Sequence, residues 1–257
     1  MKKKIIIQIN FNNVSVGSIP KLSEDWINQR ISIFMKYTFK SLTLQTSQDF
    51  SAYVLYDEST TAIIKKALSN YPSLPENIIF IKPKEFQKQV INNIKGYDYL
   101  YIVHLASDDM YHKSFIQLLH EFSPKEDTIA LVPQYGYAYD SIQNRLGKFF
   151  FWLPSYGATI YKVKDFLQGK RHNFGWRDAL KVPNEFINVK EPIWINHVHS
   201  QNSAIWFEKV LSWRSKFVKD ACDLNPWTNS ERSSAHFGPE ITDKNEIKRI
   251  LEDFMGK

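Results

Sequence analysis

Three polar residues, Ser107-Asp108-Asp109, follow the apolar segment 97–105, whose composition is typical of a buried β-strand. Two adjacent carboxylates repel each other, so they are tolerated where a cation or hydrogen-bond donors compensate their charge. A hard divalent ion that also binds diphosphate oxygens would meet this need. A helix beginning at Tyr111 offers an alternative, because either aspartate could cap it. The pair alone leaves both interpretations open.

Two histidines, His197 and His199, stand two residues apart in a segment that reads as extended. Alternation along such a segment points their rings to opposite faces, so at most one is expected to reach a given metal ion. A hydrogen-bonded structural role is the alternative for each ring. The nearby sequence has no cysteine pair and no HExxH motif, so a zinc site is not expected.

Strand-like and helix-like segments alternate around these residues in the first half of the chain. β-Branched and apolar residues predict strands over residues 4–11, 50–56, 77–81, 97–105 and 128–132. Helical spacing of apolar residues predicts helices over residues 23–44, 60–69, 84–95 and 111–122. This alternation predicts an α/β fold in which a mostly parallel central sheet is flanked by helices. Ligands bind such sheets beyond the carboxyl ends of the strands.

The second half of the chain has a different pattern. Residues 135–160 are aromatic and read as loop-rich, and residues 169–192 show little periodicity. Amphipathic helices are expected over 203–218 and 244–255. We interpret this half as an aromatic, loop-rich elaboration of one domain that spans residues 1–257.

The sequence resembles the GT-A glycosyltransferases in several segments. The strand ending in Ser107-Asp108-Asp109 is similar to their DxD-type signature, with Ala106 where a further acid is common. Residues 41–50 (SLTLQTSQDF) and 53–57 (YVLYD) are similar to a helix and a strand of that class. Arg30 and residues 194–202 (WINHVHSQN) are similar to a bacterial rhamnosyltransferase family.

This resemblance covers roughly residues 5–210 and implies a function. The expected reaction moves a hexose, such as rhamnose, from a nucleotide-sugar donor to a bacterial glycan or glycolipid acceptor, with inversion. Residues 1–133 would form the nucleotide-sugar-binding half, and residues 134–257 the acceptor-binding half with the C-terminal helices. The alternative function is a non-catalytic nucleotide- or glycan-binding protein on the same fold.

Roles for single residues also follow from the resemblance. Asp109 and His199 are expected to hold Mn²⁺ or Mg²⁺, which would stabilise the charge on the leaving diphosphate. Asp108 is expected to contact the ribose or the water shell of the metal, and Asp57 the nucleobase. Further donor contacts are expected from Asn10, Arg30 and His104. Asp57 as a strand-end turn residue and Arg30 as a surface residue of its helix are the structural alternatives.

An inverting transferase needs a general base to deprotonate the acceptor hydroxyl. We select Asp178 as this base, because Trp176 offers a face for sugar stacking beside its carboxylate. His172 and Glu185 are the other candidates, and a solvated surface acid is the structural alternative for Asp178.

The composition excludes several classes of protein. With 257 residues, 43% hydrophobic and 23% charged, the chain is neither disordered, collagen-like nor a disulfide scaffold. Its single cysteine, Cys222, fits a reducing compartment, and the short apolar stretch after Met1 does not fit an export signal, so a cytoplasmic protein is expected. P-loop, GxGxxG and GxSxG motifs are absent, which disfavours the corresponding enzyme classes.

The net charge is +6, yet the basic residues are spread along the chain, so nucleic acid is not an expected partner. The exception is the run Lys2-Lys3-Lys4. This run would allow weak peripheral association with an anionic membrane surface, and a solvated tail is the alternative.

Overall fold

The structure is a computed structural model that describes residues 1–13, 22–150, 156–172, 176–187, 191–201, 207 and 237–256. The described helices are α1 (Glu24–Lys36), α2 (Thr38–Thr43), α3 (Thr61–Leu68), α4 (Pro83–Asn93), α5 (Phe115–Glu121), α6 (Val163–Leu167) and α8 (Lys244–Met255), with 3₁₀ turns η1 (Glu58–Thr60) and η2 (Trp176–Lys181). The described strands are β1 (Lys3–Asn10), β2 (Ser51–Leu55), β3 (Ile78–Ile81), β4 (Tyr99–Ala106), β5 (Met110–Tyr111), β6 (Ala130–Val132), β7 (Tyr135–Asp140), β8 (Arg145–Phe150), β9 (Ala158–Lys162), β10 (Asn184–Phe186), β11 (Trp194–Val198) and β12 (Phe237–Ile241).

The central sheet confirms the predicted α/β class. Within the described residues it has seven strands in the order β10-β6-β9-β4-β1-β2-β3. Strands β4, β1, β2 and β3 are parallel neighbours, β6 pairs in parallel with β10, and β9 runs antiparallel to its neighbours β4 and β6. All five strands predicted from the sequence lie in this sheet.

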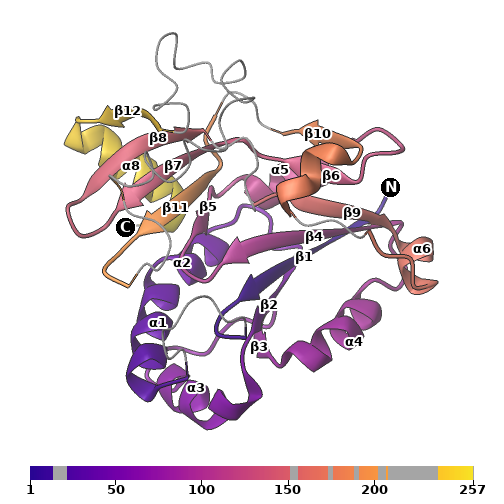
Figure 1. The fold of residues 1–257 in the computed structure, drawn as a ribbon, viewed down its shortest axis with the longest axis horizontal. Coiled ribbons are helices and arrows are strands. Elements are labelled where there is room, and N and C mark those ends of the chain that lie inside the picture. Colours follow the sequence, from indigo (N-terminus) through magenta and orange to yellow (C-terminus); the bar gives the residue numbers. More distant parts are fainter. Residues whose placement is uncertain are drawn as a thin grey trace.

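Helices cover both faces of the central sheet, as Figure 1 shows. Alternate residues of β1 face opposite sides, because the side chains of a strand alternate. Ile5, Ile7 and Ile9 pack against α1, α2, α3 and α5, whereas Ile6 packs with residues of α4 and α6. The central strands are buried on both faces, which explains their nearly continuous apolar sequences.

Strands β7, β8, β11 and β12 of the second half join β5 in a second sheet, and β9 and β10 extend the central sheet, so the prediction of a loop-rich region at 135–160 is wrong. The described strands of the second sheet have the order β12-β8-β7-β11-β5. Tyr137 and Tyr139 of β7 face α8, whereas Ala138 between them faces the main core. The aromatic residues of this segment therefore mark the two-residue period of a strand and not a loop.

The predicted helix over 23–44 is divided at Tyr37. Ser23 caps α1 as expected, because its hydroxyl accepts a hydrogen bond from the Trp26 N–H. Tyr37 leaves the helical conformation, and its ring packs 3.9 Å, between ring centres, from that of His197. The break turns α2 so that it packs against β5 and α8.

The predicted helix over 111–122 begins later than expected. Met110 and Tyr111 form β5, which pairs with β11, and α5 begins at Phe115 after Ser114. Neither Asp108 nor Asp109 is therefore a helix cap, and that alternative is wrong. Gln45, from the segment that resembles glycosyltransferases, bridges this region: its amide donates to His112 O at 2.9 Å and accepts from the Ile116 N–H at 3.0 Å.

The basic run at the start of the chain is not a solvated tail. Lys3 and Lys4 belong to β1 and are both more than nine-tenths buried. The Lys3 ammonium donates to the carbonyl groups of Leu119, His120 and Phe122 at the end of α5. Burial lowers the pKa of both lysines. Peripheral association with a membrane stays a prediction, with fewer accessible lysines to support it.

Two further expectations concern the helices of the second half. The predicted helix over 244–255 is confirmed as α8. The helix predicted over 203–218 lies outside the described residues, apart from the buried Phe207. No helix in the described part of the chain has both the length and the apolar character needed to cross a membrane.

We expect Gly136→Ala to destabilise the fold by about 1–3 kcal/mol, because overpacking a dense core forces neighbours to move. A Cβ at this position would lie 2.3 Å from the ring of Trp194, which is fully buried and whose indole N–H donates to Pro133 O. Urea unfolding measures the effect. In a Trp194→Phe background the same substitution should cost less, and an equal cost in both backgrounds would contradict the clash.

Candidate functional site

The carboxyl ends of β1, β2 and β4 meet at one edge of the central sheet. Asn10 pairs with Leu55 of β2 on one side and with Ala106 of β4 on the other. The loops that follow these three strands therefore start side by side. This edge is where parallel α/β sheets bind ligands, and it brings together several of the residues selected from the sequence.

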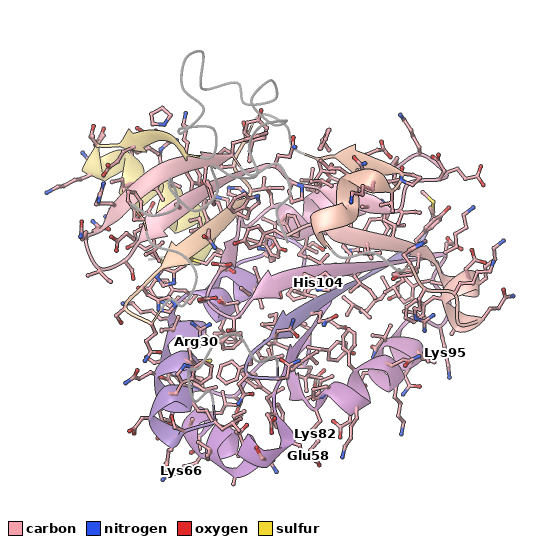
Figure 2. The ribbon with its side chains drawn as sticks, in the orientation of Figure 1. Arg30, Glu58, Lys66, Lys82, Lys95 and His104 are labelled. Atoms are coloured by element: carbon pink, nitrogen blue, oxygen red, sulfur yellow. The ribbon has the colours of Figure 1, made fainter. Side chains whose placement is uncertain are left out.

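Arg30 from α1 joins this edge to the Ser107-Asp108 segment. Its Nη1 donates to Asp108 Oδ2 at 3.0 Å, and its Nη2 donates to Ser107 Oγ at 2.7 Å. The residue is 8% exposed, so the alternative of a surface arginine is wrong. Figure 2 shows Arg30 on α1, while the labelled His104 lies along β4.

His199 contacts the same carboxylate. Its Nδ1 accepts a hydrogen bond from the Gln201 N–H at 3.1 Å, and its Nε2 lies 2.9 Å from Asp108 Oδ2 and 3.1 Å from Arg30 Nη1. Burial opposes ionisation of Asp108, but the charge of Arg30 and these hydrogen bonds outweigh it and hold the pKa of Asp108 well below its usual range. Asp108 is thus an anion fixed between a guanidinium and an imidazole.

Asp109 lies deeper, at 4% exposure, and both of its carboxylate oxygens accept hydrogen bonds from the protein. The Tyr156 hydroxyl donates to Oδ2 at 2.7 Å, the His197 N–H donates to Oδ1 at 2.8 Å, and the Asn196 amide lies 3.2–3.3 Å from both oxygens. Burial, and then the neighbouring charge of Asp108, raise the pKa of Asp109 to about 7. The surroundings of Asp109 therefore raise its pKa, whereas those of Asp108 lower the pKa of that residue.

The two histidines do not face opposite sides, which corrects the expectation from alternation. Strand β11 ends at Val198, so the pleat does not govern His199. The ring centres of His197 and His199 are 5.0 Å apart, and both residues contact Asp108. His197 is fully buried between Asp108 O and Ser141 Oγ, and burial lowers its pKa to about 3. It is a neutral structural residue.

The donor set around the two aspartates does not fit a divalent ion in this arrangement. Arg30 and His199 share Asp108 Oδ2, and protein donors occupy both oxygens of Asp109. No three His, Cys, Asp or Glu side chains gather to hold a metal within the residues that the structure describes. The assignment of Asp109 and His199 to Mn²⁺ or Mg²⁺ stays a prediction from the resemblance.

Asn10 and Asp57 lie at the neighbouring ends of β1 and β2. Asp57 Oδ1 accepts from the Ser59 N–H at 2.9 Å and from the Ser59 hydroxyl at 2.6 Å, and these hydrogen bonds lower the pKa of Asp57. Asn12, which follows β1, accepts from the Asp57 N–H at 2.8 Å. Asp57 thus has the turn role that was its structural alternative, and its role at a nucleobase stays a prediction.

Two further candidates, His104 and Asp178, lie in β4 and η2. His104 lies within β4 two residues before its end, and burial lowers its pKa to about 4, so it is neutral at pH 7. Asp178 lies in η2, and its side chain is outside the described part of the structure. The other base candidates have structural contacts: Glu185 accepts from the Lys125 N–H at 2.7 Å, and His172 Nε2 lies 3.0 Å from Ile160 O.

Sequence reasoning missed Tyr156 and Asn196, which hold Asp109. Asn196 stands inside the quoted segment 194–202, so its place beside a candidate histidine was the available signal. Tyr156 carries no such signal, because it precedes β9 by two residues and is 47 positions from Asp109 along the chain. Only the return of the chain after β8 brings it to the site.

We expect Tyr156→Phe to destabilise the fold by about 1.5–3 kcal/mol at pH 8, where Asp109 is ionised and loses a charge-assisted hydrogen bond. Tyr101→Phe is the matched control, because the Tyr101 hydroxyl is buried and has no hydrogen-bond partner among the described residues. This control should be neutral or stabilising. Urea unfolding measures the destabilisation of both variants. Equal losses of stability would contradict the hydrogen bond from Tyr156 to an ionised Asp109.

Comparison with known proteins gives only distant likenesses. No family model matches the sequence, and no curated protein is significantly similar to it. Similar solved structures include S. aureus TarS 1–349 in complex with UDP, at 13% identity over 77% of this chain and 61% of that chain (TM-score 0.43). The apo glycosyltransferase GlyE of Streptococcus pneumoniae TIGR4 matches at 14% identity over 82% and 59% (TM-score 0.35).

A cytidylyltransferase from Leptospira borgpetersenii matches over 100% of this chain and 98% of that chain, at 12% identity and a TM-score of 0.35. The chain spans 61% of the length of the TarS fragment. Because each of these TM-scores is below 0.5, the fold and the site rest on the strand order and contacts of the chain itself.

Proposed function

We propose that this protein is a nucleotide-sugar-dependent glycosyltransferase that transfers a hexose, such as rhamnose, to a bacterial glycan or glycolipid with inversion. The observation that supports it is the shared edge of β1, β2 and β4, where the Arg30–Asp108 pair follows β4 and Asp57 follows β2. A nucleotide across this edge would lie at the carboxyl ends of parallel strands, where α/β sheets bind such ligands.

The predicted donor-binding residues and the predicted general base each have a place in this proposal. Asn10 and Asp57 would contact the nucleoside and Arg30 the diphosphate, while Asp108 would hold the Arg30 guanidinium in place and His104 would be a neutral contact within β4. A guanidinium suits a diphosphate because its planar N–H groups can donate to two oxygens at once. Asp178 would then act as the general base on the acceptor hydroxyl.

A calorimetric screen of nucleoside diphosphates and nucleotide-sugars, with and without Mn²⁺, tests the proposal. Saturable binding of one donor, followed by acceptor-dependent release of its nucleoside diphosphate, is the expected result. Binding without any release would assign the chain to the alternative, a non-catalytic nucleotide-binding protein. Absence of binding to every nucleotide would refute both.

If Asp178 is the base, Asp178→Asn should lower acceptor-dependent transfer by about 10²–10⁴-fold, because proton removal from the acceptor is lost. Donor binding should not change, since the base acts only on the acceptor. Glu185→Gln is the control and should leave kcat unchanged, because the Glu185 carboxylate accepts a hydrogen bond from the Lys125 N–H. If kcat of Asp178→Asn equals that of the wild type, Asp178 is not the general base.

A further inference from the structure

The Arg30 side chain places a positive charge at the carboxyl end of β4. Arg30 is more than nine-tenths buried, and the ring of Trp26 lies 5.7 Å from its guanidinium carbon. Hydrogen bonds to Asp108 and Ser107, and a contact of 3.1 Å between Nη1 and His199 Nε2, use only part of its N–H groups. In the described part of the chain its buried Nε has no hydrogen-bond partner. Arg30 thus keeps donor capacity for a further acceptor.

The same contacts disfavour a metal ion at this place. Asp108 Oδ2 already lies 3.0 Å from Arg30 Nη1 and 2.9 Å from His199 Nε2. A divalent cation on this carboxylate would lie against the guanidinium, and like charges at such separations repel strongly away from bulk water. Asp109 offers no substitute, because its two oxygens accept hydrogen bonds from Tyr156 and from the His197 N–H.

We propose that Arg30 takes the place of the divalent metal, so that this chain binds a nucleoside diphosphate through a fixed guanidinium and without a metal ion. The inference rests on the proposed function, since it names the group that receives the diphosphate of the donor. Asp108 is then a positioning residue: it fixes the guanidinium in the unliganded site and competes with the diphosphate for its N–H groups.

Calorimetric titration of the wild-type protein with UDP, GDP, CDP and dTDP provides the first test. Each titration is run in excess EDTA and again with Mn²⁺ or Mg²⁺. The Kd of the nucleotide that binds should agree within about threefold between the two conditions. Binding that requires the metal overturns this inference and leaves the proposed function standing, whereas no binding in either condition overturns both.

Asp108→Asn gives a test in which the two mechanisms predict opposite results. The asparagine keeps the size of the side chain and removes the anion that competes for Arg30, so binding in EDTA should be as tight as in the wild type or tighter. A role of Asp108 at a metal predicts weaker binding, by about tenfold or more, together with sensitivity to EDTA. That second pattern would overturn the inference.

Arg30→Lys keeps the charge but loses the planar arrangement of donors, so the Kd should rise about tenfold or more. Arg145→Lys is the matched control, because Arg145 pairs with Glu240 on the second sheet, and it should not change the Kd. Melting curves establish that each variant is folded. If Arg30→Lys does not fold, the titration in EDTA and Asp108→Asn still decide the question. Unchanged binding in a folded Arg30→Lys variant overturns the role of Arg30.

Discussion

Replacing Arg30 with glutamine is expected to destabilise the protein by about 3 kcal/mol or more, because the substitution leaves the buried Asp108 carboxylate without its cation. The side chains of the pair are 10% and 15% exposed, so water cannot replace the guanidinium. The free energy of unfolding from urea titrations near pH 7 measures the loss.

Two further variants identify the cause of this loss. Adding Asp108→Asn to Arg30→Gln should recover part of the stability, because the unpaired charge is then gone. Lys66→Gln is the control, since Lys66 forms a salt bridge with Glu24 in which the two side chains are 76% and 49% exposed. Such a bridge contributes little, and no measurable change is expected. A double variant no more stable than Arg30→Gln would show that the charge pair is not the source.

The second large effect is that the wild-type protein loses stability as the pH rises through about 7, and that Asp109→Asn removes this loss. Burial and the charge of Asp108 raise the pKa of Asp109 from 3.8 to about 7. Between these two pH values the folded state therefore keeps a proton on Asp109 that the unfolded chain has lost. The stability that this proton contributes is complete below pH 3.8 and is lost as the pH rises through 7. Asparagine has no such proton to lose.

The free energy of unfolding of Asp109→Asn minus that of the wild type should therefore increase between pH 5 and pH 8, on the order of 2–3 kcal/mol. Taking the difference matters, because His104 and His197 have lowered pKa values and act in the opposite direction in both proteins. Asp57→Asn is the control: its pKa is lowered, so the difference should be flat over this range. A flat difference for Asp109→Asn would contradict the raised pKa.

The local sequence determined five strands of the central sheet, whereas β9 and β10 were not predicted. Each predicted strand is a short apolar run bounded by polar or turn residues, and burial on both faces requires such runs whatever the neighbouring strand is. The second sheet was not predicted, because β7 carries tyrosine in alternation with glycine and alanine, and one face of the sheet is buried only through its packing on α8. Tyr37 broke a helix that its own sequence favours, because packing on His197 competes with helical propensity.

The sequence also indicated four ionisable residues of the site, namely Arg30, Asp108, Asp109 and His199. It did not determine how these charges pair. Adjacent aspartates have the same intrinsic pKa, and their separation into an anion and a protonated acid depends on partners 40 to 90 positions away, such as Tyr156, Asn196 and Arg30. Electrostatic energy depends on distances and burial, which the chain acquires only when its strands and α1 come together.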